Sequence, residues 1–373
     1  MKSLSLVTIL VLLLSGIVSA EVITVALVGG DYDTIHDAVD AANDEDTVMV
    51  LSDYYIFTVE QGAVTIDKQL AIIGAGYDGR ENGGTTIFAP GQVFNFTTGS
   101  DESRLEGFRL QGAGTPMVAV SAPDIVVEKN MFQNRYASNY SLVITAARDT
   151  VRNNIFTNGT NGEACYGLGV SGTTNALVNN NLFGSVYEGI LTNGNTNLKI
   201  VNNILVNVGN RGIGNGYYAN NWDNANIHAN IFMNCGTAVA NRSGSPTVSY
   251  NAFHNNTTDY SGQNLEPVLS NPLFVDYGNS DVYNFESYDE DGFDFHLQSG
   301  SPCIDAGPPQ EEWYDIDPGS GGLRNDMGIY GYAWPIGDNG APTIPVVNTL
   351  QVSPATVSPS GTITIEATGR IGD

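Results

Sequence analysis

Between Leu105 and Asn255 the chain repeats one pattern of hydrophobic and polar positions, V-x-x-N-x-F-x-N, six times. A β-branched aliphatic residue stands three positions before the key asparagine, and Phe or Leu stands two positions after it. The asparagine recurs at intervals of 24, 27, 22, 27 and 21 residues, at Asn130, Asn154, Asn181, Asn203, Asn230 and Asn251. Such a regular period is typical of solenoid proteins, in which each repeat is one supersecondary unit stacked on the next.

A second, weaker pattern lies inside each repeat, where a small or flexible residue opens a short apolar alternation. Met117-Val118-Ala119-Val120 and Gly167-Leu168-Gly169-Val170 are two examples. Each repeat therefore carries more than one short strand. Gly and Asn interrupt every window that could hold a helix, and this excludes a helical repeat.

The repeat length also fits a leucine-rich repeat, which would place an aliphatic residue five positions before each asparagine. Those positions hold Ile125, Asp149, Ala176, Leu198, Ala225 and Pro246, and only Ile125 and Leu198 fit. The pattern instead predicts an all-β chain, a right-handed parallel β-helix whose turns stack about 4.8 Å apart. The repeats resemble those of the pectate-lyase-like β-helix superfamily over roughly residues 21–330. This resemblance implies a fold, and the function must be argued from a site.

The N-terminal segments predict export and a cap. Residues 1–20, with the apolar run Leu4 to Leu14 and the small-residue site Val18-Ser19-Ala20, predict a signal peptide. No other apolar run approaches this one in length, so we expect no membrane span in the mature chain, which is then secreted or on the cell surface. Residues 21–104 predict the first turns and a capping helix from Thr34 to Ala42, with Asp33 or Thr34 as N-cap.

After the regular repeats, which span residues 105–255, the pattern decays. Residues 256–333 predict the last turns and a C-terminal cap, and residues 334–347 a linker. Residues 348–373 resemble the first two strands of an immunoglobulin-like domain, but they are too short to close a sandwich. We therefore expect a monomer or one part of a longer multidomain protein.

Charge narrows the function classes. The formal charge of −26 argues against nucleic acid or an anionic membrane as partner. Residues 105–255 are nearly balanced, with eight Arg and Lys against seven Asp and Glu, so the acidity belongs to the two ends. The flank of the solenoid would not repel an acidic polysaccharide. The three cysteines, Cys165, Cys235 and Cys303, are interpreted as buried apolar residues.

The candidate site is the column just before the second strand of consecutive repeats, Tyr140, Tyr166, Glu188 and Arg211. Strict alternation points this column inward, but Glu and Arg are rarely buried, so we expect the bend to turn it outward. Arg211 and Glu188 are the candidate catalytic acid–base pair. The alternative interpretation is a tyrosine stack beside a solvated Glu–Arg pair. A neighbouring column contains Glu128 and Arg152, which we expect to form a cross-strand ion pair.

The longest insertion of the solenoid, residues 215–224, follows Arg211 and brings further candidates. Tyr217, Tyr218, Trp222 and Asp223 are predicted to bind substrate, because flat aromatic faces in an exposed loop suit sugar rings. Packing over the solenoid wall is the alternative.

The resemblance implies two kinds of catalysis, a lyase or a glycoside hydrolase. The repeats contain no three aligned acids of the kind that lyases of the superfamily use to hold Ca²⁺. The acidic run Tyr288-Asp289-Glu290-Asp291-Gly292 is a candidate Ca²⁺ site or a solvated loop. A hydrolase needs two facing carboxylates, and only Glu188 and Asp223 qualify. Two hypotheses follow: a protein that binds or degrades a polysaccharide or cell-surface glycan, and a non-catalytic surface or adhesin module. The sequence leaves open whether the protein is an enzyme.

Overall fold

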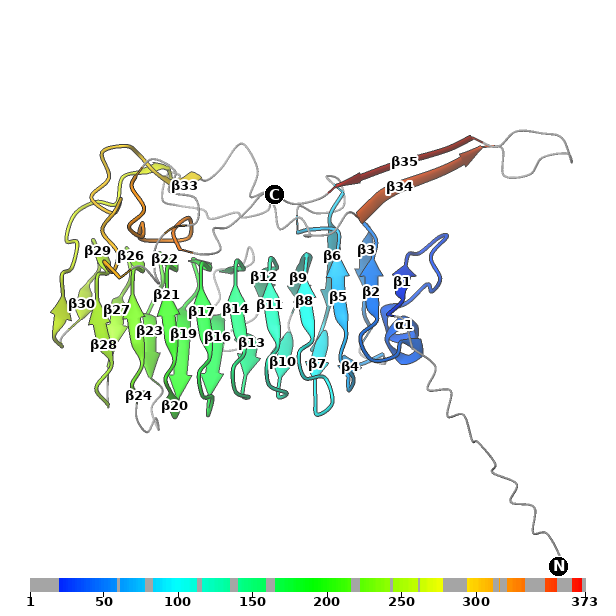
Figure 1. The fold of residues 1–373 in the computed structure, drawn as a ribbon, viewed down its shortest axis with the longest axis horizontal. Coiled ribbons are helices and arrows are strands. Elements are labelled where there is room, and N and C mark those ends of the chain that lie inside the picture. The colour runs from blue at the N-terminus through cyan, green and yellow to red at the C-terminus, as the bar shows by residue number, and fades with distance from the viewer. Residues whose placement is uncertain are drawn as a thin grey trace, which may run out of the picture.

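The computed structural model confirms a parallel β-helix (Figure 1). It describes residues 20–58, 61–77, 83–112, 116–134, 140–158, 165–215, 222–241, 244–260, 262–277, 294–310, 315, 321–332, 346–353 and 364–370. Strands from successive turns pair in parallel and in register, so that Val127 lies beside Val151 and Phe132 beside Phe156. Three parallel sheets result, of eleven, nine and nine strands.

Each turn contributes one short strand to each sheet. The first sheet contains β1 (Val22–Val25), β2 (Thr47–Val50), β5 (Ala71–Gly74), β8 (Arg104–Glu106), β11 (Val126–Glu128), β14 (Thr150–Arg152), β17 (Leu177–Asn179), β21 (Lys199–Val201), β25 (Asn226–His228), β28 (Thr247–Ser249) and β31 (Asn264–Leu265). The second sheet contains β3 (Tyr54–Ile56), β6 (Thr85–Ala89), β9 (Phe108–Gly112), β12 (Met131–Asn134), β15 (Ile155–Asn158), β18 (Leu182–Gly184), β22 (Ile204–Val206), β26 (Ile231–Met233) and β29 (Ala252–His254). The third sheet contains β4 (Val64–Ile66), β7 (Phe94–Phe96), β10 (Val118–Val120), β13 (Tyr140–Ile144), β16 (Tyr166–Ser171), β19 (Glu188–Asn193), β23 (Arg211–Asn215), β27 (Thr237–Ala240) and β30 (Thr258–Tyr260).

The chain turns between sheets through residues with left-handed backbone. Non-glycine residues at these corners have φ between 50° and 64°, a region that Asn adopts more readily than most other residues. The polar residue four positions after the key asparagine occupies the corner between the second and third sheets, at Ser185, Asn207, Asn234 and Asn255. The corner between the third and first sheets holds Glu102, Asp124, Arg148, Asn175, Asn197 and Asn224. The abundance of Asn in the repeats thus has a conformational cause.

The key asparagines form a fully buried ladder along the axis. The side-chain Oδ1 of Asn154 accepts from the backbone N–H of Asn130 at 3.0 Å and from its Nδ2 at 3.1 Å. The same pair of bonds recurs at every step to Asn251. Beside the ladder, Phe132, Phe156 and Phe183 stack with ring centroids 4.8 and 4.6 Å apart. The hydrogen bonds of the asparagine amides and the stacked phenylalanine rings therefore join each turn to the next in register.

The N-terminal helix α1 (Ile35–Ala41) lies where the sequence predicts a cap and buries Ile35, Ala38 and Val39. Thr34 is its N-cap and accepts from the backbone N–H of Asp37. At the other end, Lys68 Nζ donates to the carbonyls of Val39, Asp40 and Ala42. A lysine there satisfies the last carbonyls of the helix and complements its dipole.

At the C-terminal end, the segment after the last turn packs on the outer face of the second sheet. Phe274, Phe295, Cys303, Met327 and Ile329 pack against the apolar column Met131, Ile155, Leu182, Ile204, Ile231 and Ala252. Beyond the last turn, four strands form two antiparallel pairs, β32 (Phe274–Asp276) with β33 (Asp294–Leu297) and β34 (Val346–Ser353) with β35 (Thr364–Arg370). The second pair contains the two strands expected in residues 348–373, and the immunoglobulin-like assignment stays a prediction.

Candidate functional site

The predicted column forms one continuous strip on the third sheet. Tyr140, Tyr166, Glu188 and Arg211 are register partners on β13, β16, β19 and β23. Glycines in the neighbouring wall make room for the long side chains: a Cβ on Gly169 would lie 3.1 Å from the Tyr140 ring, and one on Gly214 would lie 3.0 Å from Arg211 Cδ. The alternation of the strands places Ile190 and Ile213 in the core. The strip therefore follows the solenoid axis.

The expected solvation of the Glu188–Arg211 pair is wrong. Only 2% of Glu188 and 9% of Arg211 is exposed. Arg211 Nη2 lies 2.8 Å from Glu188 Oε1, and Arg211 Nε donates to both carboxylate oxygens at 3.1 and 2.9 Å. Asn210 Nδ2 donates to Glu188 Oε1 at 2.7 Å, and Arg211 Nη1 donates to the carbonyl of Asn215 at 3.1 Å. These bonds replace the hydration that the two charges lose, which is how the pair can be buried.

The tyrosines form the accessible part of the strip. The rings of Tyr140 and Tyr166 meet edge to face with centroids 5.2 Å apart. Both side chains are half-buried, and burial raises the pKa of Tyr140, with Tyr166 and Glu188 adding to the rise. Tyr187, which the sequence did not single out, stacks on Tyr166 with centroids 6.3 Å apart and is 41% exposed. Its position directly before Glu188, at the same bend, could have identified Tyr187 as a candidate site residue from the sequence.

The insertion after β23 does not present Trp222 to solvent. The ring is 1% exposed, belongs to the central core, and donates from Nε1 to Thr192 Oγ1. β24 (Trp222–Asp223) pairs in parallel with β20 (Asn195–Thr196), and this pairing draws the tryptophan inward. The predicted exposed aromatic face is therefore wrong for Trp222. Tyr217 and Tyr218 lie outside the described residues, and of Asp223 only the backbone is described.

A second charge cluster lies on the first sheet and contains the expected pair Glu128 and Arg152, 2.5 Å apart. Arg104 bridges Glu128 and Glu106 at 2.5 and 2.6 Å. Glu106 is fully buried, and this burial raises the pKa of its carboxyl. Because both carboxylates are buried against cations, the cluster stabilises the wall and offers little surface to a ligand.

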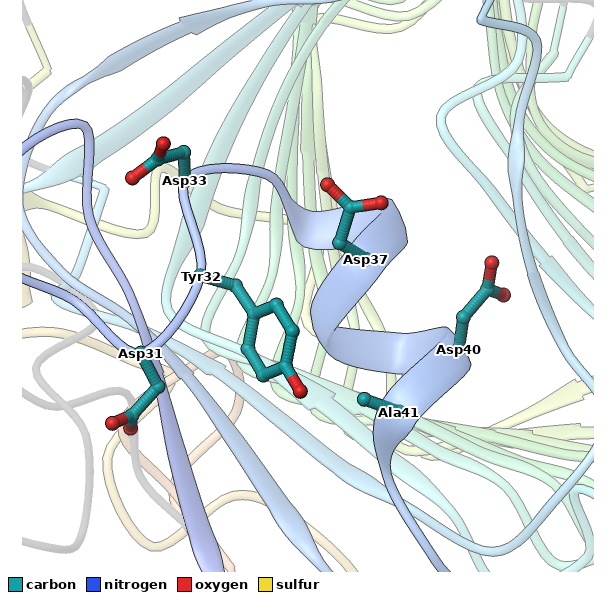
Figure 2. Close-up of a pocket in the computed structure, with 6 residues that line it drawn as sticks. All are labelled: Asp31, Tyr32, Asp33, Asp37, Asp40 and Ala41. Atoms are coloured by element: carbon teal, nitrogen blue, oxygen red, sulfur yellow. The ribbon is translucent and has the colours of Figure 1, made fainter.

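The N-terminal cap carries a cleft of about 650 Å³ lined by Asp31, Tyr32, Asp33, Asp37 and Asp40. Figure 2 shows that the four carboxylates point in different directions around the tyrosine. Asp31 accepts from the Thr24 hydroxyl, and Asp37 accepts from Thr34. The arrangement therefore serves the cap and lacks the convergence that a cation needs.

Potential metal ligands are scattered. All four histidines and three cysteines of the sequence are described, and no three His, Cys, Asp or Glu side chains gather anywhere in the described ranges. Burial raises the pKa of each cysteine thiol to about 12, and burial lowers the pKa of His228 to about 3. The cysteines are buried as expected. The acidic run 288–292 lies outside the described residues, so Ca²⁺ there stays a prediction.

Within the parts of the chain that the structure describes, no helix is long and apolar enough to cross a membrane.

Comparison with known proteins places this geometry in a family. Two solved structures are similar: a pectate lyase, Pel9A, at 16% identity and a TM-score of 0.42, covering 84% of this chain and 96% of that one, and ORF18 of Geobacillus virus E2, at 15% identity and a TM-score of 0.42, covering 64% and 57%. No curated protein matches the chain. The family model described as "Periplasmic copper-binding protein (NosD)" matches residues 39–267, which is more than half of the chain. The protein therefore belongs to the NosD family of parallel β-helix proteins.

Proposed function

We propose that this protein is an exported β-helix that binds a polysaccharide along the outer face of its third sheet. The row of Tyr140, Tyr166 and Tyr187 carries the proposal. Aromatic rings combine a large apolar face with a polar edge, which suits a sugar ring bearing hydroxyls. Because the rings follow the solenoid axis, they match a linear chain better than a compact ligand.

The Glu188–Arg211 pair supports a positioning role in this proposal. A general base needs a lone pair within reach of the substrate. Both Glu188 oxygens already accept bonds from Arg211, and one also accepts from Asn210. The pair fixes the end of the tyrosine row, so we favour binding over degradation by these two residues.

The test of the proposal is a binding screen on acidic and neutral soluble polysaccharides. Tyr187→Ala should weaken binding about 3- to 10-fold, because an aromatic contact contributes about 0.5–1.5 kcal/mol. Tyr54→Ala is the control, since Tyr54 is a partly exposed tyrosine that lies on the second sheet. Affinity electrophoresis would measure the polysaccharide affinity of both variants.

Equal binding by the wild type and the Tyr187 variant would contradict the assignment of this face. No binding to any polysaccharide would favour the alternative, a non-catalytic spacer in a cell-surface protein. The same samples should be assayed for unsaturated products, which absorb in the ultraviolet, and for new reducing ends. Either signal would indicate a lyase or a hydrolase.

The family description names copper, but the described residues of this chain do not fit it. Copper favours histidine nitrogens and sulfur ligands. The thiolate is the ligand form of cysteine, and the three buried thiols, with pKa values raised to about 12, are held in the protonated form. No histidine belongs to a group of three or more His, Cys, Asp or Glu side chains in the described ranges. Copper therefore has no part in the proposed function.

We expect the purified protein to retain well under one copper per chain after incubation with copper(I) or copper(II) and desalting. Elemental analysis by mass spectrometry measures the ratio directly. Retention of one copper per chain would overturn this conclusion.

A further inference from the structure

A groove of about 580 Å³ crosses four turns of the first sheet, away from the tyrosine row. One wall consists of the exposed corner residues Asn175, Asn197 and Asn224. The other wall follows β14, β17, β21 and β25, three of which are labelled side by side in Figure 1, and includes Leu177 and Lys199. At about 4.8 Å per turn, the groove is about 14 Å long.

The corner column changes character where the groove begins. The two preceding corners of the same column hold Asp124 and Arg148, which pair with each other, Nη2 to Oδ2 at 2.5 Å. The next three corners carry neutral amides, and φ is 58° at Asn175, 54° at Asn197 and 55° at Asn224. Asn197 Nδ2 donates to Asn175 Oδ1 at 3.1 Å, so these exposed amides are ordered along the axis. The left-handed corners hold donors and acceptors in place before any ligand arrives.

The chemistry of the walls defines the ligand. Amides supply both donors and acceptors, as hydroxyl groups require. The half-buried Leu177 gives an apolar floor against which the C–H face of a sugar can lie. Among the described residues that line the groove, Lys199 is the single charged side chain. We infer that the groove is a second glycan site, which takes a short stretch of an acidic oligosaccharide with one carboxylate at Lys199.

This site is independent of the proposed function, because it lies on a different sheet. The formal charge of −26 resides mainly in the two ends of the chain, so the nearly balanced repeats that carry the groove do not repel an anionic ligand. Lys199 is charged and none of the described residues that line the groove carries a carboxylate, so binding of an acidic ligand at this face would point to Lys199. Binding should also weaken with salt, since one exposed ion pair is involved.

The experiment measures the affinity of the whole protein for tetraglucuronate and for cellotetraose by calorimetry. We expect tetraglucuronate to bind more tightly. Lys199→Gln should weaken that binding about tenfold and remove the preference over cellotetraose, and Asn197→Ala should weaken binding of both by a few-fold. Asn255→Ala is the matched control, because Asn255 is also exposed and left-handed, at φ 53°, but lies at a different corner. It should bind like the wild type.

Three results would overturn the inference: equal affinity for the two tetrasaccharides, no effect of Lys199→Gln, or no binding of either ligand. Tyr187→Ala separates the two faces. In the Tyr187→Ala background, Lys199→Gln should still weaken tetraglucuronate binding about tenfold, and the absence of any further loss there would assign the ligand to the third sheet instead.

Discussion

Glu188→Ala is expected to lower the free energy of unfolding by about 3–5 kcal/mol, and Arg211→Ala by a similar amount, because each leaves the opposite charge buried without its partner. The pair is almost fully enclosed, with side-chain exposures of 3% and 11%. Urea unfolding followed by circular dichroism gives the change. Activity losses in these variants would therefore report folding as well as chemistry.

The chain provides a matched control for this prediction. Asp124 and Arg148 form the same kind of cross-turn pair, but their side chains are 33% and 55% exposed. Asp124→Asn removes the charge and keeps a residue that tolerates the left-handed backbone at this corner, so it should cost about 1 kcal/mol or less. The double replacement Glu188→Leu with Arg211→Met should recover most of the lost stability, since a buried pair can often be exchanged for apolar side chains. If Glu188→Ala costs no more than Asp124→Asn, the buried pair does not hold the wall together.

Asp149→Asn is expected to remove a large pH dependence of stability. Asp149 is 1% exposed and occupies the inward column that holds Ile125 and Ala176 in neighbouring turns. Burial raises its pKa from 3.8 to about 7, although its Oδ1 accepts from the Ile125 N–H at 3.0 Å. The carboxyl therefore stays protonated in the folded protein at pH values where the unfolded chain has already released the proton.

Stability then falls as the pH rises from about 4 to about 7, because the folded state binds more protons than the unfolded state across that window. The rise in the pKa of Asp149 from 3.8 to about 7 corresponds to about 4 kcal/mol of unfolding free energy. The difference in unfolding free energy between Asp149→Asn and the wild type should change by that amount between pH 4 and pH 8, in favour of the variant at pH 8. Asp315 and Asp326, with pKa values raised by burial to about 7 and about 6, contribute in the same direction in both proteins.

Thermal unfolding at several pH values measures this difference, and any fixed cost of the new amide cancels between them. A profile for Asp149→Asn that runs parallel to that of the wild type would show that Asp149 is not the source of the pH dependence.

The sequence predicted which strands carry the candidate site, but it did not predict how far the side chains of the site are exposed to solvent. The repeat register alone placed Tyr140, Tyr166, Glu188 and Arg211 on consecutive strands, because parallel in-register stacking aligns equivalent positions. Whether a side chain in that strip meets water depends on how its own turn and the neighbouring turns fold around it. Asn210, Asn215 and Gly214 together enclose Arg211 and Glu188, and β20 draws Trp222 into the core.

The sequence by itself determined the β-helix, the ladder from Asn130 to Asn251 and the capping helix, because each depends on a local period or on a neighbour one turn away. Only the tertiary structure decided the burial of Glu188, Arg211 and Trp222, the titration of Asp149 and the groove beside Lys199. These properties depend on how several turns together exclude water, and a one-dimensional pattern records the spacing of residues but not the solvent around them.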